Sequence, residues 1–363
     1  MSDAKPTNST SNSSTASFAT PNDPARNPSA TSNTASTSSP TTIPAQGAQA
    51  RVVPSLADAR QYPVIAGICL VAIAVTLAWW MKWADISMLL DNVEIQRGQL
   101  WRLLTDIFPH LTVTHLIFNL YWTWIFGTVI EARLGHRKTL LVILLLGVGS
   151  SAAQFALAGG GAGLSGVGYG LFGMLWVLSK RDPRFEGTMP KSTVNLFLGW
   201  FALCVVLTVT NVWNVGNAAH GGGAVLGVLI GLAIAEPARP MVWAVAAAAV
   251  TAATLWGATL GRPLVNYSDA YAYDEAQLGY DALRAGKNAE AVIWFSNASK
   301  RLPADAVIWY DLGLAYDRVG DTEKADAAYT MAHQLKPDDP DYGAAAGRRV
   351  LELLKKQQSG EKP

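Results

Sequence analysis

A serine and a histidine stand near the starts of two separate apolar segments of this chain. Ser165 lies among glycines in Gly163-Leu164-Ser165-Gly166, and His220 is followed by three glycines. A hydroxyl and an imidazole at a common depth suggest a nucleophile activated by a general base. In a soluble protein such a serine would more often cap a helix. A polar group at membrane depth must be satisfied or functional, which favours chemistry over capping here.

Three further polar side chains fit the same chemistry. His115 and Asn119 are one helical turn apart, so they share a helix face. Together with the backbone N–H of Ser165, they could stabilise an oxyanion. Tyr169 follows Ser165 by one turn and could stack on or orient the imidazole, for which no carboxylate is available at that depth. His115 and Asn119 could instead only join two helices by hydrogen bonds, and His110 is predicted to be an exposed loop residue.

Glycines recur along one side of each apolar segment that carries the serine or the histidine. They are Gly166, Gly170 and Gly173 in the first segment and Gly223, Gly227 and Gly231 in the second. Small residues at this spacing allow two membrane helices to pack closely. Close packing would bring His220 to hydrogen-bonding distance of Ser165.

The composition is typical of a membrane protein. Of 363 residues, 50% are hydrophobic and 15% are charged, against roughly 25% charged residues in soluble domains. The net charge of +1 gives no global basic field for nucleic acid. Cys69 and Cys204 lie in different apolar segments and are interpreted as small hydrophobic residues rather than a disulfide. No residue spacing indicates a metal site, and no cofactor is expected.

Apolar segments long enough to cross a bilayer predict an all-α, polytopic helical bundle. The segments are 64–81, 114–130, 139–158, 165–179, 193–211, 217–235 and 241–261. We expect a six-span core over 60–238 and one additional span over 241–261. Residues 84–113 mix apolar and charged residues, which favours a structured loop in the headgroup region.

Loop charges predict the orientation of the bundle. The basic loops fall on the side of the N-terminus, which should therefore be cytoplasmic. Residues 1–55, rich in Ser and Thr, are predicted to form a disordered cytoplasmic tail. With seven spans the C-terminus lies outside the cytoplasm. The span starts that carry His115, Ser165 and His220 then all face the non-cytoplasmic side.

The sequence after Arg262 repeats itself at a spacing of 34 residues. Leu278-Gly279 and Phe295 in the first copy correspond to Leu312-Gly313 and Tyr329 in the second. This pattern resembles the tetratricopeptide repeat, in which small residues let paired helices approach. Residues 270–357 are predicted to form two copies and a capping helix around 341–356, as a small α-helical module that binds a protein partner.

Five motifs in order resemble the rhomboid family of intramembrane serine proteases over about residues 60–262. They are Trp101-Arg102, His115-x-x-x-Asn119, Glu131-x-Arg133-x-Gly135, Gly163-Leu164-Ser165-Gly166 with Tyr169, and Ala219-His220-x-x-Gly223-x-x-x-Gly227. Any one motif is weak, but five in order are specific. The sequence departs from the six-span bacterial core by its seventh span and its repeats.

The resemblance implies a role for each matching residue. Ser165 and His220 would form a catalytic dyad, and His115, Asn119 and the Ser165 amide would form the oxyanion site. Tyr169 would support His220, with Gly163, Gly166 and Gly223 as supporting motif glycines. Trp101 and Arg102 would anchor the first loop, and Glu131 and Arg133 would be structural. Transmembrane or membrane-anchored substrates would be cut near the non-cytoplasmic face of what would be a bacterial inner membrane.

Two other functions remain open at the level of sequence. A non-catalytic membrane adaptor would hold transmembrane clients in the bundle and recruit a partner through the repeats. Such proteins usually lose the serine or the histidine, and this chain keeps both. A transporter would need charged pairs deep in its spans or an inverted repeat, and neither is found in the sequence.

Overall fold

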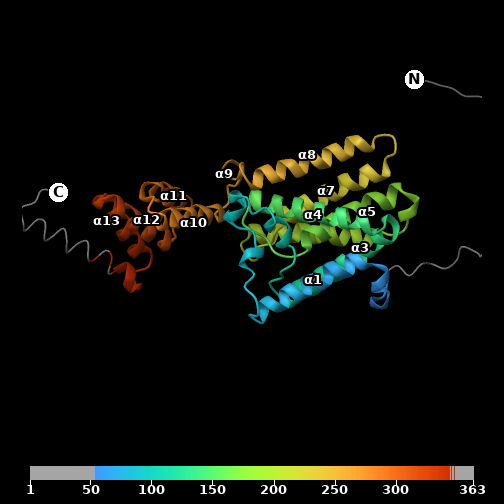
Figure 1. Cartoon of the computed structure of the whole chain (residues 1–363), viewed down its shortest axis with the longest axis horizontal. Coiled ribbons are helices and arrows are strands. Elements are labelled where there is room, and N and C mark those ends of the chain that lie inside the picture. The colour runs from blue at the N-terminus through green and yellow to red at the C-terminus, as the bar shows by residue number, and fades with distance from the viewer. Residues whose placement is uncertain (1–53, 344, 346, 348–363) are drawn as a thin grey trace, which may run out of the picture. The chain divides into compact units, whose positions relative to one another are not determined.

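The computed structural model describes residues 54–343, 345 and 347, all of which belong to one compact unit. Within these residues the regular elements are helices, with no strand (Figure 1). The predicted tail lies outside the described residues except for its last two positions. Most of the predicted capping helix around 341–356 also lies outside them.

Six of the described helices are long and apolar enough to cross a membrane. They are α1 (Pro63–Trp80), α3 (Val113–Leu134), α4 (His136–Leu157), α6 (Lys191–Val209), α7 (Asn217–Ala235) and α8 (Pro240–Ala258). Of the seven predicted spans, the one over 165–179 is not among these six; it corresponds to α5 (Ser165–Arg181), which has 17 residues. At 1.5 Å per residue α5 is about 26 Å long, somewhat short of a bilayer core of about 30 Å. Every α5 residue from Gly166 to Leu175 is buried, so α5 forms the centre of the bundle.

Glycines set the spacing between α5 and α7. A Cβ atom on Gly223 would lie 2.1 Å from the carbonyl oxygen of Gly166. A Cβ atom on Gly227 would lie 1.9 Å from the carbonyl oxygen of Gly170. Any side chain at these α7 positions would therefore push the helices apart. The predicted close packing is present, with backbone against backbone.

The connection between α1 and α3 folds into short helices rather than a span. It contains the 3-10 helices η2 (Ser87–Leu89) and η3 (Val93–Arg97), followed by α2 (Arg102–Thr105). The buried Arg102 donates through Nη1 to the carbonyl oxygens of Ser87 and Leu90, at 2.6 and 2.9 Å. Arg102 thus ties the loop to itself, while the neighbouring Trp101 is half exposed.

Glu131 joins α3 to the start of α1. Its carboxylate accepts hydrogen bonds from the backbone N–H groups of Val64 and Ile65, both at 3.0 Å, and contacts His136 Nδ1 at 2.7 Å. The first amides of a helix have no partner within the helix, so an acidic group there is stabilising. Arg133 donates to the backbone carbonyls of Val129 and Arg184. Both side chains therefore make structural contacts.

Two 3-10 helices complete the membrane part. They are η1 (Leu56–Gln61) before α1 and η4 (Pro183–Phe185) after α5. After α8 comes the one-turn helix α9 (Arg262–Val265).

Two similar helix pairs follow α9 and make up what we call the repeat module (Figure 1). Its helices are α10 (Ala270–Arg284), α11 (Asn288–Arg301), α12 (Ala306–Val319) and α13 (Thr322–Leu335). In the first pair Gly279 lies against the ring of Phe295, and in the second Gly313 lies against the ring of Tyr329. The 34-residue sequence repeat is thus a repeat of helix packing, while its assignment to the tetratricopeptide family stays a prediction.

Candidate active site

Ser165 and His220 lie at the same end of α5 and α7, whose backbones pack in direct contact. Ser165 is the first residue of α5, and His220 is in the first turn of α7. The two helices run parallel, because Gly223 faces Gly166 and Gly227 faces Gly170. The structure therefore brings the predicted serine and histidine to one level, at the ends where both helices begin.

Tyr169 fixes the orientation of His220. Their rings stack with centroids 4.5 Å apart and planes 24° apart. The Tyr169 hydroxyl donates to the backbone carbonyl of Phe197 at 3.2 Å, which holds the ring from its other end. The His220 side chain is buried, and its Nδ1 has no hydrogen-bond partner among residues 54–343. Within residues 54–343 no hydrogen bond joins Ser165 to His220. In many enzymes the hydrogen bond between nucleophile and base forms or shortens only when substrate binds.

The chain makes a sharp turn at Gly163, two residues before the serine. Its φ is +104°, a conformation that side chains other than glycine rarely adopt. A Cβ atom there would also lie 2.8 Å from Cε1 of His115 and 3.2 Å from its Nε2. Glycine thus allows the His115 ring to lie directly against the segment that carries Ser165.

Asn119 supplies an unused donor on the same helix face as His115. Its side chain is 6% exposed, and its Nδ2 has no hydrogen-bond partner in the described part of the chain. A buried N–H without a partner is costly, so it is readily explained as a donor kept for a ligand. The start of α3 is fixed separately, because Thr112 Oγ1 accepts from the backbone N–H of His115 at 3.1 Å.

His110 was predicted to be an exposed loop residue, and this prediction is wrong. Its ring is fully buried, and Nε2 accepts a hydrogen bond from the backbone N–H of Leu164 at 3.3 Å. Nδ1 lies 2.9 Å from the carbonyl of Phe108 and donates to it in the tautomer that these contacts require. Burial, followed by the nearby His115, lowers the pKa of His110 to about 4, so the ring is neutral at neutral pH.

A pair of buried carboxyl groups escaped the sequence analysis. Asp106 is 2% exposed and accepts from Ser151 Oγ at 2.8 Å, and its backbone carbonyl accepts from Gly163 N–H at 3.0 Å. Burial raises the pKa of Asp106 to about 7. Burial and then the Asp106 charge raise the pKa of Asp91 well above its ordinary value. Nothing in the mixed sequence of the loop distinguishes these carboxyls from solvated ones.

An apolar pocket of about 350 Å³ opens beside the histidine, between α5, α6 and α7. Its lining includes Tyr169, Phe201 and Gly221, the residue after His220. The outer wall is α6, which buries only Phe197 and Cys204 against the bundle. The pocket is therefore an apolar hollow on the side of the bundle, beside the residue that follows His220.

Known proteins resemble the part of the chain that holds this site. Residues 97–237 match the model of the rhomboid domain. The rhomboid protease GlpG of Serratia proteamaculans is 34% identical over 161 residues, which cover 43% of this chain and 53% of that protein. The same protease of Yersinia pseudotuberculosis and of Yersinia pestis is 33% identical over 157 residues, or 42% of this chain and 51% of theirs. The chain thus spans about half the length of the curated relatives it matches, and these matches support the rhomboid family for its membrane part.

Proposed function

We propose that this protein is an intramembrane serine endopeptidase of the rhomboid type. Ser165 attacks the scissile carbonyl carbon, and His220 accepts the hydroxyl proton and later gives it to the leaving amine. The observation that carries the proposal is the placement of Ser165 and His220 at the same end of the glycine-packed helices α5 and α7, with the imidazole stacked on Tyr169.

The oxyanion of the tetrahedral intermediate would be stabilised by three groups. They are the backbone N–H of Ser165, the Nδ2 of Asn119 and the ring of His115. Two observations support this role: Asn119 Nδ2 is buried and has no hydrogen-bond partner within residues 54–343, and the His115 ring lies against Gly163. Donors held in place before the reaction are worth more than donors that must reorganise.

Membrane-spanning proteins are the substrates that the site best accommodates. The apolar pocket between α5, α6 and α7 would offer an unfolded transmembrane segment a binding place beside Tyr169 and Gly221. The family resemblance and the loop charges favour cleavage near the non-cytoplasmic face. We place the protein in a bacterial inner membrane, with its N-terminus cytoplasmic and the repeat module outside the cytoplasm.

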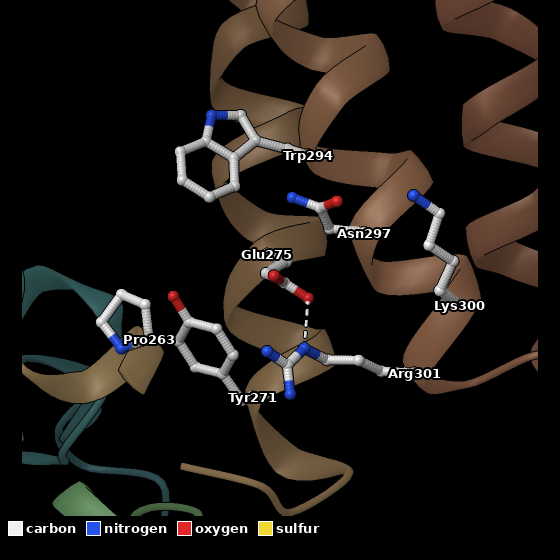
Figure 2. A pocket seen from close by; sticks show the side chains of 7 residues that line it. All are labelled: Pro263, Tyr271, Glu275, Trp294, Asn297, Lys300 and Arg301. Atoms are coloured by element: carbon white, nitrogen blue, oxygen red, sulfur yellow. Dashed lines mark ion pairs between the residues drawn. The ribbon is translucent and has the colours of Figure 1, made fainter. Parts of the chain in front are cut away.

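The repeat module would recruit a substrate or a protein partner. A pocket of about 470 Å³ on its first helix pair is lined by the ring of Trp294, the amide of Asn297 and the amine of Lys300 (Figure 2). At its floor Arg301 Nε pairs with the carboxylate of Glu275 at 3.0 Å. An aromatic ring and an exposed amine that line the same pocket suit a peptide that carries an apolar and an acidic side chain.

A fluorescent fluorophosphonate probe on the detergent-solubilised protein tests the proposed chemistry. Wild type should be labelled, while Ser165→Ala and His220→Ala should both lose labelling and keep their thermal unfolding. Ser179→Ala is the matched control, because Ser179 lies in the same helix at its far end and should not affect labelling. A folded wild type that is not labelled would contradict the proposal and favour the non-catalytic adaptor.

A further inference from the structure

The segment that presents Ser165 is a loop with little intrinsic rigidity. Between α4 and α5 the chain reads Gly159-Gly160-Gly161-Ala162-Gly163-Leu164. Glycine loses more conformational freedom on folding than any other residue, so a loop of this kind needs fixed points to hold a single conformation. A nucleophile at its end reacts efficiently only when it is held in a narrow range of positions.

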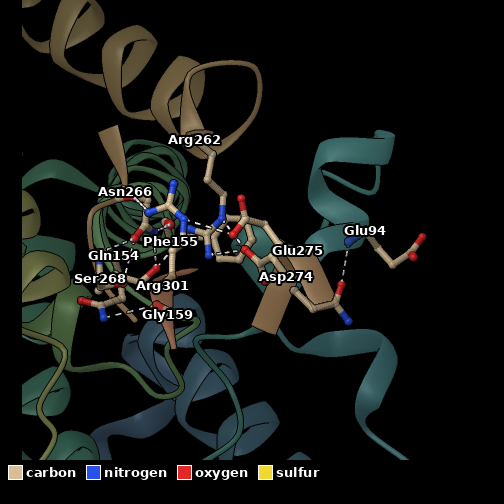
Figure 3. A network of polar contacts seen from close by, with 12 residues as sticks. Glu94, Gln154, Phe155, Gly159, Arg262, Asn266, Ser268, Asp274, Glu275 and Arg301 are labelled. Carbon is tan, nitrogen blue, oxygen red and sulfur yellow. Dashed lines mark hydrogen bonds and ion pairs between the residues drawn. The ribbon is translucent and has the colours of Figure 1, made fainter. Parts of the chain in front are cut away.

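One fixed point lies at the start of this loop and comes from the segment that joins α8 to the repeat module. The carbonyl oxygen of Ala158 accepts from Arg262 Nη1 at 3.0 Å and from Asn266 Nδ2 at 2.8 Å. Figure 3 labels these two donor residues. Asn266 Nδ2 also lies 3.3 Å from the carbonyl oxygen of Phe155. The last carbonyls of a helix lack partners within it. Two side chains from more than a hundred residues away therefore cap α4. They do so where the loop before Ser165 begins, which comprises residues 159–164 and is called the serine loop below.

Arg262 is itself held by the repeat module. Its side chain is fully buried, with the guanidinium 3.5 Å from the centroid of the Phe155 ring. Its Nε donates to Asp274 of α10 at 2.7 Å, so the charge that approaches Ala158 is neutralised by the first helix of the repeats. Removing Asp274 would take away the hydrogen-bonded partner of this buried guanidinium, and breaking a buried ion pair in this way is destabilising.

Asn266 is oriented by its own turn. Its Oδ1 accepts from the backbone N–H of Ser268 at 3.0 Å and from the Ser268 hydroxyl at 2.7 Å. These bonds identify the oxygen of the amide and leave Nδ2 pointing at α4.

The start of this loop is also linked, through Gln154, to the residue before His220. Gln154 Nε2 donates to the carbonyl of Gly159 at 3.3 Å, and Gln154 Oε1 accepts from the N–H of Ala219 at 3.2 Å. Gly159 in turn lies against Ala270 of α10, with its Cβ position 3.1 Å from the alanine Cβ. The first residue of the serine loop is thus in contact with α4, with α10 and, through Gln154, with the residue before His220.

We propose that Arg262 and Asn266 are positioning residues, which hold the loop before Ser165 through the carbonyl of Ala158. The repeat module then sets the reactivity of the serine in addition to any recruitment of substrate. This inference rests on the proposed function, since it requires Ser165 to be the nucleophile.

The test compares Asn266→Asp with wild type in the full-length protein. Aspartate keeps the acceptor that Ser268 needs but has no N–H to donate to Ala158. We expect the rate of fluorophosphonate labelling to fall about tenfold, and kcat for a transmembrane substrate to fall in the same proportion with KM unchanged. Asn288→Asp is the matched control, because it makes the same chemical change on α11, away from α4, and should label at the wild-type rate.

A second variant guards against a purely structural effect. Arg262→Lys keeps a positive charge near Asp274 but cannot stack and donate in two directions as a guanidinium does. It should lose part of the labelling rate while its thermal unfolding in detergent stays cooperative. Wild-type labelling rates in folded Asn266→Asp, or an effect on KM alone, would overturn the positioning role. Failure of the proposed function would look different, since wild type itself would then not be labelled.

Discussion

Substituting Gly227 by alanine tests whether close packing of α5 and α7 builds the site. The added methyl group would lie 1.9 Å from the carbonyl oxygen of Gly170, 2.7 Å from its carbonyl carbon and 2.9 Å from its Cα. All three atoms belong to the backbone, so no side chain can rotate out of the way. The helices themselves have to separate or tilt.

The size of the effect follows from these distances. A carbon atom and a carbonyl oxygen approach to about 3.3 Å at closest, so the helices must move apart by about 1.4 Å at this level. Overpacking of this kind costs about 1–3 kcal/mol of unfolding free energy. A displacement near 1 Å between a nucleophile and its base lowers reactivity about 100-fold. We expect Gly227→Ala to fold with reduced stability and to react with the fluorophosphonate about 100 times more slowly.

The control is Gly168→Ala in the partner helix. A Cβ atom at Gly168 would have no atom within 4 Å. Alanine there should be neutral or should stabilise the helix by about 0.5–1 kcal/mol, with labelling unchanged. The experiment measures the thermal unfolding and the labelling rate of both variants and of wild type in the same detergent. Wild-type kinetics in Gly227→Ala would refute the argument that glycine contact places His220 beside Ser165.

Three further predictions concern other parts of the molecule. Because burial raises the pKa of Asp106 to about 7, its protonated form favours the native state fully below about pH 4, and this contribution is lost as the pH rises to about 7. The melting temperature of Asp106→Asn relative to wild type should therefore increase between about pH 5 and about pH 8, and a constant difference would contradict this. Glu131→Ala removes the acceptor of two amides at the start of α1 and should lower the free energy of unfolding by about 2–4 kcal/mol. The labelling rate per folded molecule should not change. A slower rate would indicate that Glu131 acts directly in the reaction. Trp294→Ala and Lys300→Ala should raise KM for a transmembrane substrate and leave probe labelling at the wild-type rate, whereas unchanged KM in both would exclude this pocket from recruitment.

Much of the bundle is predictable because its sequence rules are local. Long apolar segments mark the helices, and the glycine spacing in α5 and α7 marks a helix pair whose backbones touch. The positions of His115, Asn119, Ser165 and His220 follow once the helix starts are known. The stacking of Tyr169 on His220 is likewise suggested by its position one turn after the serine.

The loops are less predictable, because their burial depends on contacts between distant segments. His110 resembles a solvated residue in sequence, but the loop folds back and places its ring against Leu164. Asp91 and Asp106 are likewise buried by the tertiary fold of a segment that contains both charged and apolar residues. The link from Arg262 to Ala158 spans 104 residues and leaves no local pattern at either end.

The hydrogen bond from Arg262 to Ala158 has a consequence for the order in which the protein is synthesised and assembled. A chain is synthesised from its N-terminus, so α4 and Ser165 leave the ribosome and enter the bilayer before Arg262 and Asn266 have been translated. During that interval the carbonyl of Ala158 lacks both of its donors. We expect the newly inserted bundle to be a poor catalyst until α10 has been made and has reached its place. If the proposed function holds, full reactivity of Ser165 would appear only after the repeat module has been translated.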